Sequence, residues 1–165
     1  MAFSLRPDRL LNTYRDVTPE LLQSRGITLL LCDLDYTLAP KSVKTPDDEV
    51  AAWLSALRDA GVTVAVVSNN RDPARVETFC RSLGIPFVGH AGKPGTRGYR
   101  RAMELAGAAP SQTAALGDKL LTDMLAANRA GIWALMVEPL GGPVGAWNHV
   151  LHLMQRPFKA LRKEK

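Results

Sequence analysis

The 165-residue sequence predicts an α/β fold of the doubly wound type, with helices on both faces of a five-stranded parallel sheet and therefore three layers. Three observations support this prediction. Helix and strand signals alternate from end to end without a fixed repeat. The expected strands are apolar on both faces, as in buried parallel sheets. The composition, with 46% hydrophobic and 22% charged residues, is that of one ordinary globular domain.

The element boundaries come from capping residues, prolines and glycines. Thr18-Pro19, Thr45-Pro46 and Asp72-Pro73 each place a capping residue before a proline, which is favoured at the first helical position. The expected helices run from Thr18 to Gly26, Thr45 to Gly61, Asp72 to Gly84, about Thr96 to Leu105, and from the fourth strand to Ala130. The expected strands are Ile27 to Cys32, Val62 to Val67, Pro86 to Val88, Thr113 to Leu116 and Ile132 to Val137.

Charge and cysteine usage limit the class of protein. The net charge is +5 and the isoelectric point is near 9.5, which favours polyanionic or phosphorylated partners without choosing among them. Cys32 and Cys80 form neither a disulfide framework nor a Cys-x-x-Cys metal motif, so a reducing cytoplasm is the expected location. No apolar run approaches the roughly 20 residues that span a bilayer, so we expect a protein that is soluble or peripheral at the inner face of the membrane.

Carboxylates follow two of the expected strands. Asp33 and Asp35 lie at positions i and i+2 after the first strand, where side chains of an extended chain point to the same side. Asp118 ends the fourth strand, and Asp123 lies in the first turn of the next helix. Two charges about 4 Å apart repel by about 4 kcal/mol at an effective dielectric constant of about 20, so a cation would stabilise such a cluster. All-oxygen ligands favour Mg²⁺, although helix capping or solvation is the alternative for either later acid alone.

Two further loops carry groups suited to an anion. Ser68, Asn69 and Asn70 follow the second strand and offer hydroxyl and amide donors. Lys93 lies in a Gly- and Pro-flanked loop after the third strand, and its charge would be favourable beside acids and phosphate. Each signal is weak alone, because loops are rich in such residues for turn formation.

Together these residues resemble the four ordered motifs of the haloacid dehalogenase (HAD) superfamily of phosphohydrolases. The motifs are Asp33 to Thr37, Ser68, Lys93, and Gly117-Asp118 with Asp123, and the resemblance extends from about Thr18 to Val137. Within the superfamily, the motifs and their flanking stretches resemble subfamily IIIA, in particular the bacterial YqeG-type phosphatases. Tyr36 departs from that type, which often carries Asn at this position.

The resemblance implies a Mg²⁺-dependent phosphomonoester hydrolase that acts through a covalent intermediate. Asp33 would be the nucleophile that becomes an aspartyl phosphate, which divides one difficult displacement into two steps. Asp35 would protonate the leaving oxygen and later activate water. Ser68 would donate a hydrogen bond to the phosphoryl oxygens, and Lys93 would neutralise charge on the phosphate and on the nucleophile.

The same resemblance implies the metal ligands and the substrate contacts. Mg²⁺ would bind Asp33, Asp118 and the backbone carbonyl of Asp35. Asp123 would support either the metal or Lys93. The residues expected to contact substrate are Thr37, Asn69 and Asn70.

The spacing of the motifs leaves no room for a cap domain. The 24 residues from Leu38 to Gly61 and the 24 from Asn69 to Gly92 are already used by the expected helices and a strand. An open site predicts a large or surface-bound phosphomonoester, because the substrate itself must exclude water. Capless relatives include phosphatases of phosphatidylglycerophosphate, which makes this lipid the preferred substrate. A phosphoprotein, a nucleic-acid end and a sugar phosphate are the alternatives, although nucleic acid is not favoured as a partner.

Residues 1–140 are expected to form the catalytic domain, including an N-terminal helical segment, and residues 141–165 a basic amphipathic tail. The apolar residues of the tail recur at helical spacing: Trp147, Val150, Leu151, Met154, Phe158 and Leu161. Five basic residues against one acid follow from Arg156 onward. Either the apolar stripe packs on the sheet and the basic end is solvated, or the tail lies on an anionic membrane.

Two non-enzymatic functions are alternatives for a protein with a similar fold. A signalling receiver domain also has acids, a hydroxyl and a lysine at strand ends. Its phosphorylated Asp, however, ends a strand in the middle of the chain, whereas the corresponding strands in this sequence end in Ser68 and near His90. A scaffold that binds phosphorylated partners without turnover is the second alternative. Since no residue needed for turnover is missing, catalysis is the preferred interpretation.

Overall fold

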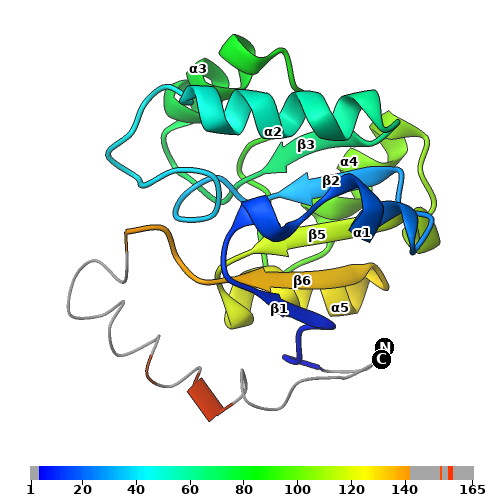
Figure 1. The fold of residues 1–165 in the computed structure, drawn as a ribbon. Coiled ribbons are helices and arrows are strands. Elements are labelled where there is room, and N and C mark those ends of the chain that lie inside the picture. Colours follow the sequence, from blue (N-terminus) through cyan, green and yellow to red (C-terminus); the bar gives the residue numbers. More distant parts are fainter. Residues whose placement is uncertain (1–3, 142–152, 154–155, 158–165) are drawn as a thin grey trace.

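The computed structural model describes residues 4–141, 153 and 156–157, and it has three layers (Figure 1). A six-stranded sheet forms the middle layer in the order β1-β6-β5-β2-β3-β4, with every neighbouring pair parallel. The strands are β1 (Arg9–Leu11), β2 (Leu29–Cys32), β3 (Thr63–Val67), β4 (Phe87–Val88), β5 (Thr113–Gly117) and β6 (Trp133–Val137). The doubly wound α/β fold predicted from the sequence is confirmed.

Within residues 4–141, five α-helices and three short helical turns connect the strands. The helices are α1 (Pro19–Gln23), α2 (Asp48–Asp59), α3 (Pro73–Leu83), α4 (Arg97–Ala106) and α5 (Leu125–Ala130). The turns are 3₁₀ at Tyr14–Asp16 and Pro110–Gln112 and π-helical at Leu120–Met124. The described residues between β2 and β3, and between β3 and α4, contain no inserted domain, in agreement with the capless fold that the spacing predicts.

The sheet has six strands, so the predicted number of five is wrong. The additional strand, β1, pairs in parallel with β6 at the edge of the sheet, with Arg9 opposite Leu135. Asp8 fixes this edge, because its backbone N–H donates to the carbonyl of Ala134 and its carboxylate accepts from the N–H of the same residue. A three-residue edge strand that is only half-buried has too few apolar positions to produce a detectable alternation.

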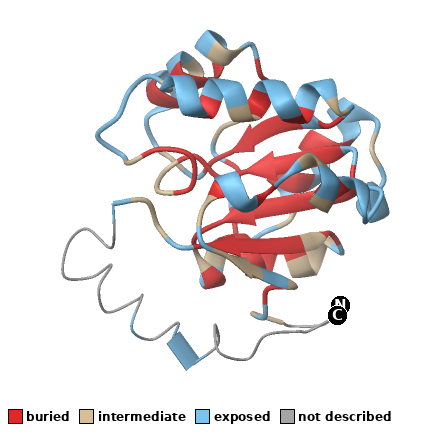
Figure 2. Cartoon of the chain, in the orientation of Figure 1, coloured by how far each residue is buried: buried red, intermediate tan, exposed pale blue. Residues whose placement is uncertain are grey.

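Alternation along the strands divides the interior into two cores, and Figure 2 shows the strands β2, β3, β5 and β6 as mostly buried. Leu30 and Cys32 of β2 pack with residues of α1, α2 and α3 on one face. Leu29 and Leu31 pack with residues of α4 and α5 on the other. Because both faces of the sheet are covered, its strands carry apolar residues at consecutive positions.

Two of the three predicted cap positions are confirmed. The hydroxyl of Thr18 accepts from the N–H of Leu21, and the carboxylate of Asp72 accepts from the first turn of α3. The predicted start of α2 at Thr45-Pro46 is wrong, since the cap is Asp47 and its carboxylate accepts from Val50 N–H at 2.9 Å. The Asp side chain is the stronger cap, so the helix begins two residues later.

The strand order places three chemical motifs side by side. Strands β5, β2 and β3 are neighbours at the centre of the sheet, and the residues that follow them are Asp118, Asp33 and Ser68. All three strands run in the same direction, so these residues meet at one edge of the sheet, where ligands bind in open α/β folds.

No helix among the described residues is long and apolar enough to cross a membrane. The apolar stripe predicted for residues 141–165 lies outside the described residues.

Candidate active site

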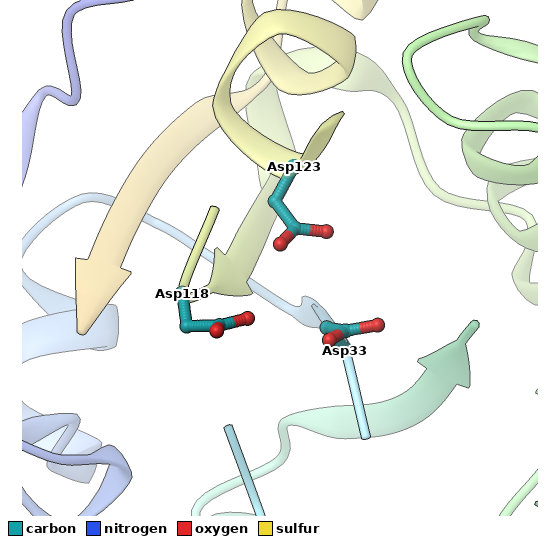
Figure 3. Close-up of side chains that lie close together, drawn as sticks. All are labelled: Asp33, Asp118 and Asp123. Carbon is teal, nitrogen blue, oxygen red and sulfur yellow. The ribbon is translucent and has the colours of Figure 1, made fainter. Parts of the chain in front are cut away.

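Three buried carboxylates converge where β2 and β5 end (Figure 3). Asp33 follows β2, Asp118 follows β5, and Asp123 lies on the π-helical turn after β5. Each offers a carboxylate oxygen, and these oxygens lie within 4.8 Å of one another. The structure thus brings together three of the four acids expected at one site, while Asp35 is not part of this group, and the roles of all four stay predictions.

Gly117, the last residue of β5, makes this convergence sterically possible. A Cβ atom at this position would lie 2.4 Å from the Cβ of Asp123, which is closer than such atoms approach in proteins. The Asp123 side chain therefore occupies the space beside Gly117. Its Oδ2 accepts from the N–H of Lys119, which holds the carboxylate from the side of the strand end.

Lys93 is the buried cation of the cluster. Its Nζ lies 2.8 Å from Oδ1 of Asp33 and 2.6 Å from Oδ1 of Asp123, and it also donates to the backbone carbonyl of Val67. Burial favours the neutral amine, but the carboxylates of Asp123 and Asp33 outweigh burial and raise the pKa of Lys93 well above its ordinary value. The ammonium therefore stays charged beside the carboxylates.

The donor set fits a hard divalent cation. Burial, together with the charges of Asp33 and Asp123, raises the pKa of Asp118 to about 7, although the ammonium of Lys119 at 3.1 Å acts in the opposite direction. The pKa of a buried carboxyl group is raised when too little positive charge is near to stabilise its ionised form. A cation bound by oxygen ligands would supply that positive charge. Both oxygens of Asp123 already accept from Lys93 and Lys119, so these contacts favour its supporting role toward Lys93.

Asp35 is held by a residue that the sequence analysis missed. Arg75, buried on α3, donates from Nε to Oδ1 of Asp35 at 2.9 Å. The same guanidinium donates to the backbone carbonyls of Pro40 and Val43. Asn70 Nδ2 donates to Oδ2 of Asp35 at 2.6 Å. The only sequence signal for Arg75 is a charged residue on the apolar face of a helix, next to Val76 and close to Phe79.

The residues after β3 organise their neighbours. Ser68 Oγ is buried and accepts from the N–H of Asn70 at 3.0 Å, so its proton is available to a ligand. The side chain of Asn69 bonds both backbone polar groups of Lys93. Its Nδ2 donates to the carbonyl of Lys93 at 2.8 Å and its Oδ1 accepts from the N–H of Lys93 at 2.9 Å, which fixes the loop that contains Lys93 against β3. Asn69 and Asn70 line the pocket, and the bonds that the structure gives their amides position Lys93 and Asp35. Their contact with substrate stays a prediction.

Thr37 of the first motif lies away from the pocket. Thr37 is fully buried, its Oγ1 has no hydrogen-bond partner among the described residues, and it does not line the pocket.

Lys119 of the fourth motif was not predicted as a site residue. Its Nζ pairs with the carboxylate of Asp118 and lies 5.7 Å from the ring centroid of Tyr36. Tyr36 has a positive φ of 65°, a conformation that Asn adopts more readily.

An open pocket of about 600 Å³ lies over these groups. Its lining combines carboxylates, amides, a hydroxyl and three basic side chains: Asp33, Asp35, Lys41, Ser68, Asn69, Asn70, Arg71, Asp72 and Lys119. A second pocket of about 300 Å³ lies away from the motifs, near the start of β3, and none of the predicted residues lines it. Five of the predicted residues line the first pocket, namely Asp33, Asp35, Ser68, Asn69 and Asn70, whereas Thr37, Lys93, Asp118 and Asp123 do not.

The model of the haloacid dehalogenase-like hydrolase family matches residues 7–131. The chain belongs to this family. It is also 30% identical over 159 residues to the probable phosphatase YqeG of Bacillus subtilis, which covers 96% of this chain and 92% of the relative. These matches confirm the resemblance and the enzyme class expected from the sequence, a phosphatase of the HAD type.

Solved structures of HAD phosphatases share the fold. The cobalt-bound deoxy-D-mannose-octulosonate 8-phosphate phosphatase of Haemophilus influenzae is 20% identical with a TM-score of 0.57, covering 80% of this chain and 89% of that chain. The 3-deoxy-D-manno-octulosonate 8-phosphate phosphatase of Moraxella catarrhalis, in complex with magnesium, phosphate and a KDO molecule, is 20% identical with a TM-score of 0.56. The second match covers 86% of this chain and 92% of that chain.

The buried ion pair of Arg75 predicts a large effect on stability. Arg75→Ala leaves the carboxylate of Asp35, whose side chain is 15% exposed, without its cation. We expect the free energy of unfolding, measured with urea, to fall by roughly 3 kcal/mol. The control is Arg81→Ala on the same helix, which removes a pair whose Arg side chain is 79% exposed and should cost less than about 1 kcal/mol. Equal losses for the two variants would contradict the stabilising role of the buried pair.

The raised pKa of Asp118 predicts pH-dependent stabilisation by Mg²⁺. Without a cation the folded state holds this proton up to about pH 7, whereas the unfolded chain releases it near pH 4, so this group lowers stability progressively as the pH rises through that range. Because a bound cation offsets this loss, Mg²⁺ should raise the melting temperature more at about pH 8 than at about pH 5.5. In Asp118→Asn the increase should be small at both pH values. An equal increase at both pH values in the wild type would contradict the assignment.

Proposed function

We propose that this HAD phosphatase hydrolyses phosphomonoesters through an aspartyl phosphate formed on Asp33. The observation that carries the proposal is the placement of this carboxylate. It is buried beside Lys93, with Oδ1 held by the ammonium at 2.8 Å, and it also lines the open pocket. A carboxylate with one oxygen fixed and a cation beside it is positioned for attack and electrostatically prepared for phosphate.

The proposed reaction has two displacements. In the first, a carboxylate oxygen of Asp33 bonds to phosphorus, the bond from phosphorus to the leaving oxygen breaks, and Asp35 gives its proton to that oxygen. In the second, water attacks the aspartyl phosphate, Asp35 takes the water's proton, and phosphate and the free carboxylate are released. Arg75 keeps Oδ1 of Asp35 in place, so Oδ2, bonded only to the neutral amide of Asn70, is the oxygen suited to proton transfer.

Ser68 and Lys93 serve the phosphoryl group in this scheme. Ser68 Oγ lines the pocket and already accepts one hydrogen bond, so its O–H can donate to a phosphoryl oxygen. The Lys93 ammonium remains charged and reduces the repulsion between Asp33 and an incoming phosphate. Because phosphoryl transfer depends mostly on positioning and charge neutralisation, these two groups supply much of what the reaction requires.

We propose Mg²⁺ as the cofactor, held by Asp33, Asp118 and the backbone carbonyl of Asp35. When bound there, the ion supplies positive charge to the phosphoryl oxygens. The all-oxygen donor set and the raised pKa of Asp118 support a hard cation at this position. The magnesium-bound Moraxella catarrhalis enzyme shares this fold.

The preferred substrate is phosphatidylglycerophosphate, with the enzyme bound peripherally to the inner face of the membrane. The pocket is open, the described chain has no cap, and the net charge of +5 favours an anionic surface. The basic amphipathic pattern in residues 141–165 supports the same location. The alternatives are a phosphoprotein, a nucleic-acid end and a sugar phosphate, the last being the substrate class in the names of several structural neighbours.

The nucleophile is tested with a generic aryl phosphate and Mg²⁺. Asp33→Asn should reduce phosphate release by a factor of about 10⁴ or more, because the neutral amide that replaces the carboxylate is too weak a nucleophile to form the acyl phosphate. The matched control is Asp72→Asn, which removes the same charge from the pocket lining while Asn preserves the helix cap, and it should retain most activity. Substantial activity in Asp33→Asn would contradict the covalent mechanism.

The substrate is tested by comparing phosphate release from phosphatidylglycerophosphate in mixed micelles with release from soluble sugar phosphates, phosphopeptides and 5′-phosphorylated oligonucleotides. The lipid should give the highest kcat/KM. A strong preference for a soluble sugar phosphate would overturn both the open-site argument and the lipid assignment, while leaving the phosphatase chemistry intact.

A further inference from the structure

We propose that Lys41 and Arg71 form a second anion-binding subsite, which recognises a negatively charged group on the leaving portion of the substrate. The inference rests on the proposed phosphatase function and narrows its substrate class. The preferred substrates would be phosphomonoesters that carry a further phosphodiester or carboxylate group, rather than phosphomonoesters with a neutral remainder.

Each of the other basic side chains of the site has a carboxylate partner, and only these two do not among the described residues. Lys93 pairs with Asp33 and Asp123, while Lys119 pairs with Asp118. Arg75 pairs with Asp35 in the same way.

Lys41 and Arg71 line the same pocket and are exposed, but neither makes an ion pair within the part of the chain that the structure describes. Asp72, the remaining acid of the lining, accepts from the first turn of α3 as its helix cap. Two cations are therefore left without carboxylate partners in a pocket that handles anions.

The backbone on which each cation stands is fixed. Arg75 donates to the carbonyls of Pro40 and Val43, the residues on either side of the short segment that contains Lys41. Arg71 stands between Asn70 and Asp72, and the N–H of Asp72 donates to Oδ1 of Asn70 at 2.7 Å. Only the two long side chains need to be ordered on binding, which limits the entropic cost of recognition.

The pocket is larger than the phosphoryl chemistry requires. Asp33 and Ser68 mark the place of the phosphoryl group, yet the volume of about 600 Å³ lies in the range of about 300 to 1,000 Å³ typical of sites for whole small molecules. The rest of the lining comes from the loop with Lys41, the loop with Arg71, and Lys119 after β5. An anionic group on the leaving portion would therefore find positive charge in that space.

The test uses matched soluble substrates, so that membrane binding does not enter the result. Glucose 6-phosphate has a neutral remainder, 6-phosphogluconate adds a carboxylate, and glycerophosphoglycerophosphate adds a phosphodiester. At low ionic strength the wild type should show a kcat/KM about tenfold higher for an anionic substrate than for glucose 6-phosphate, and about 0.5 M salt should reduce this ratio. The two anionic arms identify which group the subsite prefers.

The variants assign the preference to residues. Lys41→Ala with Arg71→Ala should bring the ratio close to 1, and each single variant should give an intermediate ratio. Arg100→Ala is the control, because it removes the same charge from an exposed position on α4 that does not line the pocket, and it should keep the wild-type ratio. Melting temperatures close to that of the wild type would show that the variants are folded.

Two results would overturn the inference while leaving the phosphatase function in place: a wild type that hydrolyses all three substrates equally, or a double variant that keeps the full preference. A wild type that releases phosphate from none of them, nor from an aryl phosphate, would overturn the proposed function itself.

Discussion

The arrangement of the site depends on compensation of buried charge. Asp33, Asp118 and Asp123 are each less than a tenth exposed, and carboxylates in such surroundings are costly unless a cation accompanies them. The Lys93 ammonium meets two of them at 2.8 and 2.6 Å. Gly117 gives Asp123 the space to approach, and the central position of β2 between β5 and β3 brings the other partners to one edge. The fold and the charge balance therefore constrain the same residues.

A second set of side chains holds the chemical groups in position. Asn69 fixes the backbone of Lys93, and Asn70 together with Arg75 fixes both oxygens of Asp35. Rigid support matters here because a misplacement of about 1 Å in a reacting group can cost two orders of magnitude in rate. The loop after β3 thus organises the nucleophile's cation and the proposed acid and base at once.

The sequence predicted those parts of the site that follow from strand direction. Asp33, Ser68 and Asp118 stand directly after apolar runs, and parallel strands bring their carboxyl ends to the same edge whatever the details of packing. Arg75 could not be found in this way, because its partners are the carboxylate of Asp35 and two loop carbonyls remote in the chain. Strand β1 escaped for a similar reason, since its pairing with β6 depends on a contact about 125 residues away and not on any local pattern.

The short loop after β3 gives Asn69 and Asn70 a role that sequence position alone does not predict. Sequence position made Asn69 and Asn70 candidates for substrate contact, which stays a prediction, and in the structure their amides also bond Lys93 and Asp35. A side chain that satisfies a neighbour's backbone contributes to catalysis through geometry, which no residue-type signal distinguishes from direct binding. Loop residues of catalytic motifs are for this reason the hardest to assign from sequence.

The charge pattern also sets what the site can accept. Around the strand ends, the carboxylates of Asp33, Asp35, Asp118 and Asp123 outnumber the paired cations Lys93, Arg75 and Lys119 by one. An excess negative charge opposes an anionic phosphate and favours a divalent cation, whose binding would reverse the sign of the local charge. Lys41 and Arg71, which make no ion pair with any described residue, lie in the same pocket, so positive potential would then extend from the nucleophile outward along the lining. A substrate that carries a second anionic group on its leaving portion, besides the phosphate that is hydrolysed, matches that distribution better than a substrate whose leaving portion is neutral.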